Sequence, residues 1–125
     1  MKKDFVDINE ELRFANVVSV ESGGTKTLYV SGQTGESADL KSQSIEAFTN
    51  LKNRLAAAGA KTTDIVKMTT YVVDFSPEKA RDAFAGAGLV LTDVKEPPTA
   101  TMVGVQSLFS PDILIEVEAI AVIDA

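Results

Sequence analysis

The chain has 125 residues and a net charge of -6, and 45% of its residues are hydrophobic, which predicts one domain with a substantial core. It contains no cysteine, histidine or tryptophan. These absences exclude disulfides, thiolate nucleophiles, Ser-His triads and zinc sites built from Cys or His. The acidic balance also lacks the surplus of lysine and arginine that a nucleic-acid-binding surface needs.

The N-terminal third of the chain predicts three strands. A weak one over Lys3 to Ile8 precedes two that are richer in β-branched and aromatic residues, Phe14 to Val20 and Thr27 to Ser31. The glycines of the segment between the latter two favour a hairpin turn. The small, polar stretch Ser31 to Gly35 is either a loop leading into a helix or a pocket wall whose backbone faces a ligand.

Two helices and a strand are expected in the middle of the chain. Apolar residues at three- and four-residue spacing predict a long helix that follows Asp39, a good N-cap, and stops at Gly59. The stretch from Ile65 to Phe75 is typical of a central strand. Ser76 with the proline after it predicts the start of a second, short helix that ends at about Gly86.

The C-terminal stretch from Pro97 to Val122 predicts two strands joined by a proline-containing turn. In the second of them, alternation places Ile115 and Val117 on one face and Glu116 and Glu118 on the other. Two carboxylates on one strand face indicate either a solvated surface or a functional site. If both lie in one cleft, their repulsion is expected to raise the pKa of one of them.

These elements predict an α+β fold in which both helices pack on one face of a mixed sheet. The chain is too short to supply a third helix for the other sheet face, so self-association is the simplest way to cover it. No apolar run is long enough for a membrane helix and no secretory signal begins the chain. A cytoplasmic protein without a membrane partner is therefore expected.

Five segments, in order and over nearly the whole chain, resemble the Rid family, also called YjgF. They are the segments Leu28 to Gly35, Ala56 to Ala60, Asp64 to Ser76, the Pro-Pro-Thr-Ala-Thr-Met-Val stretch, and Ile115 to Val122. The resemblance implies a chorismate-mutase-like fold and a homotrimer, with an inner barrel of sheets, helices outside and three ligand clefts between subunits. The expected self-association would then be this trimer.

The resemblance also implies a set of cleft residues. Glu116 matches the glutamate thought to position an attacking water in the enamine/imine deaminases of the family, and Ser31 and Gly32 match the loop that contributes backbone groups. Phe14 stands where those enzymes have a tyrosine, and Arg81 lies near a helix asparagine of theirs. The predicted catalytic residue is thus Glu116, and the predicted ligand-binding residues are Phe14, Ser31, Gly32, Arg81, Ala100, Thr101 and Met102.

One position departs from the deaminase pattern. Ala100 stands where those enzymes carry the arginine that binds the substrate carboxylate, and the three arginines of the chain lie elsewhere. Losing one partner of a buried ion pair costs about 2 to 5 kcal/mol, roughly thirty- to several-thousandfold in binding. Efficient hydrolysis of small 2-imino acids is therefore not expected, and a lining with Phe14, Ala100 and Met102 suits a neutral or aromatic ligand.

Three hypotheses about function remain open. The first is a Rid-type trimer that binds a small metabolite in intersubunit clefts without efficient deaminase activity. The second is a hydrolase for altered enamine, imine or related C-N substrates, in which Glu116 guides water. The third is a nucleic-acid or ribonuclease role, which the charge and the absence of histidine disfavour. No cofactor is expected, and no clustered oxygen ligands predict a metal site.

Overall fold

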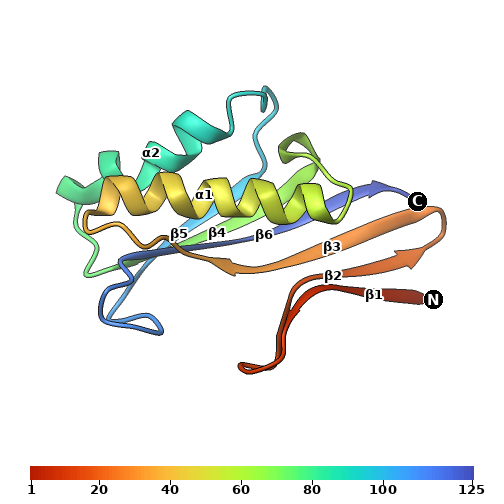
Figure 1. The fold of residues 1–125 in the computed structure, drawn as a ribbon. Helices are drawn as coiled ribbons and strands as arrows, with labels where there is room; N and C mark the ends of the chain where they lie inside the picture. The colour runs from red at the N-terminus through yellow and green to blue at the C-terminus, as the bar shows by residue number, and fades with distance from the viewer.

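A computed structural model describes residues 1 to 125. Six strands form one mixed sheet, and two α-helices lie side by side across one of its faces (Figure 1). The strand order is β1-β2-β3-β6-β4-β5, and only the β4–β5 pair is parallel. The strands are β1 (Lys2–Asn9), β2 (Phe14–Ser22), β3 (Thr25–Gln33), β4 (Ile65–Val73), β5 (Thr99–Val105) and β6 (Ile115–Asp124).

The long helix, α1 (Leu40–Ala57), forms where the apolar spacing predicts it. The Asp39 carboxylate accepts a hydrogen bond of 2.9 Å from the Ser42 N–H and so caps the first turn. Gly59, with φ at 86°, takes the left-handed conformation that ends the helix. The helix buries its apolar side against β3 and β6, where Leu28 and Val117 are fully buried.

The second helix, α2 (Ala80–Val90), is longer than the sequence predicts. A single 3-10 turn, Pro77–Lys79, precedes it, and the helix continues through Gly86 rather than ending there. The reason is packing: Gly86 faces Ser44 of α1, and a Cβ at this position would lie 2.2 Å from the Ser44 carbonyl oxygen. This glycine therefore permits close helix contact and does not mark a stop. None of the helices is both long and apolar enough to cross a membrane.

The C-terminal strands do not pair with each other. The sequence predicts two strands joined by a turn, but β4 lies between them, antiparallel to β6 and parallel to β5. The chain leaves β5 at one edge, crosses the end of β4 and enters the middle of the sheet. The predicted α+β class, with a mixed sheet and both helices on one face, is confirmed.

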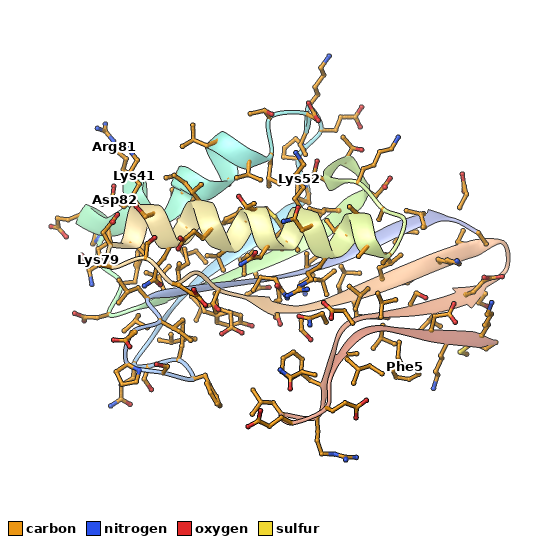
Figure 2. The ribbon with its side chains drawn as sticks, in the orientation of Figure 1. Phe5, Lys41, Lys52, Lys79, Arg81 and Asp82 are labelled. Atoms are coloured by element: carbon orange, nitrogen blue, oxygen red, sulfur yellow. The ribbon has the colours of Figure 1, made fainter.

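The sheet face opposite the helices is not covered by any part of the chain. Figure 2 shows Phe5 of β1 on that side, away from the two helices, and its side chain is 58% exposed. Tyr29 and Val122 are also exposed and project from neighbouring positions on β3 and β6. Exposed apolar and aromatic side chains gathered on one sheet face, here beside the charged Glu116 and Glu118, are typical of a surface that a partner covers.

Candidate functional site

Glu116 lies on the uncovered face of the sheet, as the alternation along β6 predicts. Its neighbours Ile115 and Val117 are fully buried beneath the helices, so the Glu116 side chain points to the opposite side. It is half-buried, and none of the three ion pairs of the chain involves it. The carboxylate therefore has no cation of its own within the chain.

Gly32 lies directly against this carboxylate. A Cβ at Gly32 would lie 1.7 Å from Glu116 Oε2 and 2.5 Å from Glu116 Cδ, so any side chain would occupy the space of the glutamate. The absence of a side chain allows the β3 backbone to approach Glu116 closely, which is a common reason for a glycine inside a strand.

A β-bulge places Ser31 and Gly32 at this point. Val30 pairs with Ala119 and Gln33 with Val117, so two residues of β3 face one residue of β6. Gly32 and Gln33 thus belong to the strand, which extends two residues beyond its predicted end. The Ser31 hydroxyl donates a hydrogen bond of 2.7 Å to the Ala15 carbonyl of β2. Because that bond holds the bulge in place, we assign the hydroxyl a positioning role.

A cavity of about 500 Å³ opens above Glu116. It brings together four of the predicted residues, and its walls add four that the sequence did not single out. The lining consists of Leu12, Phe14, Ser31, Gly32, Thr34, Phe109, Ile113 and Glu116. Leu12 and Phe109 come from turns, where no periodic pattern distinguishes a cavity wall from a solvated loop. The only available signal was the unusual presence of large apolar residues in turns.

The three predicted residues of β5 do not line this cavity. Met102 packs with Val72 and Ile115 on the helix side of the sheet, and Ala100, two residues earlier, faces the same side. Thr101 pairs with Thr69 and faces the opposite side. Within one chain, Ala100 and Met102 are therefore separated from Glu116 by the sheet itself.

Arg81 is also distant from the cavity in sequence and in space. It lies in the first turn of α2, and Figure 2 shows its side chain at the outer end of the helix layer, near Lys41 and pointing away from the sheet. In one chain, this arginine cannot compensate for the absence of an arginine at position 100.

Burial is the main cause that raises the pKa of the Glu116 carboxyl, and the negative charge of Glu118 adds to it. Glu118 is held by Tyr71, whose hydroxyl donates a hydrogen bond of 2.7 Å to Glu118 Oε1. This hydrogen bond is the largest cause of the raised pKa of the Tyr71 phenol. A carboxyl whose pKa is raised above its ordinary value is a stronger base, and this suits it to accept a proton and return it.

The raised pKa predicts a specific pH dependence of stability. The ordinary pKa of this carboxyl is 4.5, and its pKa in the folded chain is higher. At a pH between these two pKa values, Glu116 holds a proton in the folded chain that it has lost in the unfolded chain. The contribution of Glu116 to stability therefore falls as the pH rises through this window. Glu116→Gln, which carries no charge, should gain stability relative to the native chain over the same window and keep that advantage above it.

Urea unfolding of both chains at a series of pH values measures this difference. Glu10→Gln, at an exposed carboxylate of the β1–β2 turn, is the control, and its curve should run parallel to the native one. A Glu116→Gln curve that is also parallel would show that the cavity does not perturb the carboxyl.

A larger cavity of about 620 Å³ lies between α1 and the end of the β1–β2 hairpin. Two of its three charged residues, Arg54 and Glu46, already have partners, and only the Glu36 carboxylate does not. Arg54 forms an ion pair with Asp7 and donates to Gln33, and Glu46 accepts hydrogen bonds from the backbone N–H groups of Glu36 and Ser37. Because these bonds join parts of the chain to one another, the cavity above Glu116 is the better candidate site.

A family model described as Endoribonuclease L-PSP matches residues 9–123 of the chain. YyfB from Yersinia pestis, a protein of unknown function of the Rid family, is 31% identical, with 98% of this chain and 100% of that chain covered and a TM-score of 0.72. No curated protein matches the chain.

Two further solved structures share the fold. Rv2704 from Mycobacterium tuberculosis, a YjgF-family member, has a TM-score of 0.81 at 25% identity, covering 98% of this chain and all of that one. TdcF from E. coli with bound serine has a TM-score of 0.74 at 26% identity, covering 89% and 88% of the two chains. These similarities extend over most of the chain and confirm the resemblance noted in the sequence.

Proposed function

This chain belongs to the endoribonuclease L-PSP family, also called YjgF or Rid, and we propose that it forms a homotrimer that binds a small metabolite in clefts between its subunits. The uncovered sheet face, with Phe5, Tyr29 and Val122 exposed, supports the trimer because a closed assembly would remove this apolar surface from water. The serine bound to the related E. coli TdcF supports a small polar ligand.

The observation that carries the proposal is the division of the predicted site within one chain. Phe14, Gly32 and Glu116 line one cavity, while Ala100 and Met102 lie across the sheet on the edge strand β5. These two groups of residues would form one site if the β5 edge of a neighbouring copy lay beside the cavity, because Ala100 and Met102 of that copy would then face Glu116 of this one. A cleft between subunits explains this division, and a site inside a monomer does not.

Sedimentation equilibrium tests the assembly. We expect a mass of about 40 kDa, three times the 13.3 kDa of one chain. Val122→Asp, which adds a charge to the uncovered sheet face, should dissociate the trimer. Leu89→Asp is the matched control because Leu89 is 61% exposed on α2, on the helix layer. A native mass of one chain, or equal masses for the two variants, would refute the proposed assembly.

The proposed activity is binding without efficient hydrolysis of 2-imino acids. The cavity above Glu116 has no lysine or arginine in its lining, and the β5 edge that would complete it offers Ala100 in place of the family arginine. A substrate carboxylate would therefore meet no cation in the cleft and would lie near a glutamate. A ribonuclease role is disfavoured by the net charge of -6, since RNA binding depends on neutralising phosphates.

A second candidate is a hydrolase for an imine or enamine of another class. It is favoured by the raised pKa of Glu116, which fits a group that takes a proton from water and returns it to a leaving amine. The bulge at Ser31 and Gly32 would supply backbone N–H groups for developing negative charge. Glu116→Gln should then abolish turnover and leave the trimer intact; unchanged turnover would rule out this mechanism.

A further inference from the structure

Half of the residues that line the cavity above Glu116 are apolar, and these come from the β1–β2 hairpin and the β5–β6 connection. The β1–β2 turn contributes Leu12, which is 53% exposed, and the β5–β6 connection contributes Phe109, which is 83% exposed. Figure 1 shows both segments projecting on the side of the sheet away from the helices. Phe14, at the start of β2, adds a second aromatic ring to the lining.

The β1–β2 turn is closed by a bond of its own, and the β5–β6 connection is bonded to α1. The Leu12 N–H is bonded to Asn9 Oδ1 at 2.9 Å. The β5–β6 connection is held by Gln43 of α1, which donates to the Asp112 carbonyl at 2.7 Å and accepts from the Leu114 N–H at 2.8 Å. Phe109 is therefore an exposed ring on an anchored segment, and ordering it against a ligand costs less than ordering a free loop.

The cavity lining carries only negative charge. Glu116 is the sole ionisable residue of the lining. Arg13 is next to Leu12 in the chain but does not line the cavity. If the site is completed by a neighbouring β5, that strand, Thr-Ala-Thr-Met-Val-Gly-Val, brings no charge of either sign. The site thus holds a partly dehydrated carboxylate that no cation of the chain neutralises, and a cationic ligand would supply that charge.

We propose that this cavity selects small organic cations, such as protonated amines, that carry a flat apolar group, with Glu116 setting the preference for the positive charge and Phe109 the preference for the flat group. The cationic end pairs with Glu116, and the apolar end lies between Phe109, Phe14 and Leu12. The flat group gains by packing offset or edge-to-face against the aromatic rings of Phe109 and Phe14, beyond the apolar area that it buries. An anionic ligand would instead face the Glu116 charge with no cation to offset it.

This inference rests on the proposed function, because it names the ligand class of the same cleft. It differs from that proposal in a way that can be measured. Binding of any small molecule at the cavity agrees with the proposed function, whereas only a preference for cations over anions of the same shape agrees with the inference.

The test is an amide NMR titration of the isotope-labelled trimer with four probes. 2-Phenylethylamine carries a ring and a positive charge, 2-phenylethanol a ring and no charge, 3-phenylpropanoate a ring and a negative charge, and ethylamine a charge and no ring. We expect the amine with the ring to bind about tenfold more tightly than the alcohol, with the carboxylate and ethylamine weaker than both.

Three variants locate the effect. Phe109→Ala should weaken the binding of 2-phenylethylamine about tenfold, because the ring of the probe loses its aromatic contact. Phe84→Ala should leave its binding unchanged, because Phe84 is 55% exposed on α2, in the helix layer. Glu116→Gln should remove the preference for the amine over the alcohol while both still bind.

The outcomes separate the two proposals. If 3-phenylpropanoate binds as tightly as the amine, or if Phe109→Ala behaves like Phe84→Ala, the cation inference is wrong and the metabolite-binding function stands. If no probe shifts the amides of Gly32, Phe109 and Glu116 at millimolar concentration, the cation inference is wrong, while the proposed function, which names no particular metabolite, is judged by the mass of the assembly.

Discussion

Replacing Gly86 by alanine is expected to lower the free energy of unfolding by about 3 kcal/mol, at the upper end of what overpacking in a core costs. The new Cβ would lie 2.2 Å from the Ser44 carbonyl oxygen and 2.4 Å from Phe48 Cδ2. Because the nearest atom belongs to the α1 backbone, the clash is relieved only if the two helices move apart. No single side chain can turn aside to make room.

Helix separation at Gly86 would also break a buried polar contact. The Ser44 hydroxyl, fully buried, donates to the Ala83 carbonyl at 2.7 Å and accepts from the Gly86 N–H at 2.9 Å. An unpaired buried hydroxyl costs about 1 to 3 kcal/mol, and this cost adds to that of the clash.

Gly88→Ala provides the matched control, because Gly88 belongs to the same helix and a Cβ added there would have no neighbouring atom within 4 Å. Alanine is the better helix former, so this variant should gain about 0.5 to 1 kcal/mol. Chemical denaturation of the two variants and the native chain measures both changes. Equal stability of the two variants would show that the helices are not in the described contact.

Ala100→Arg is expected to create hydrolysis of 2-imino acids, with a gain of roughly thirty- to several-thousandfold in substrate binding. The exposed edge position on β5 leaves room for the longer side chain. A guanidinium forms two parallel charge-assisted hydrogen bonds with a carboxylate, and in the proposed trimer it would lie beside the Glu116 of a neighbouring copy.

Ala100→Lys is the control for the geometry of this effect. Lysine supplies the same charge without the planar, two-pronged guanidinium. The gain in substrate binding of Ala100→Lys should therefore be clearly smaller than that of Ala100→Arg. The measurement is the rate at which 2-imino acids, generated in place by an amino-acid oxidase, disappear in the presence of each variant. If neither variant gains activity while both remain trimeric, position 100 does not face the cleft of a neighbouring copy.

The local features of the fold could be predicted from the sequence, and the pairing of distant strands could not. The N-cap at Asp39 and the stop at Gly59 depend on neighbouring residues, and both are confirmed. The contact between Gly86 and Ser44 depends on how two helices pack, and for this reason the predicted end of α2 was wrong. The order β6-β4-β5 likewise has no local signal, since β5 and β6 alternate equally well whether or not they are neighbours.

For the candidate site, the direction of one side chain was predictable and the surrounding walls were not. Alternation along β6 places Glu116 on the face opposite the core, and the structure confirms it. The bulge that moves Gly32 against Glu116 arises from the register between β3 and β6. The separation of Ala100 from Glu116 also follows from strand order, which one sequence does not reveal.

Whether the cleft binds without hydrolysing 2-imino acids is measured by the imine assay on the native protein. We predict that 2-imino acids decay at the rate seen without protein, because no cation in the cleft holds their carboxylate. Release of 2-oxo acid well above that rate would contradict this account. If Glu116→Gln then abolished the release, the chain would be a hydrolase that binds its substrate without the family arginine.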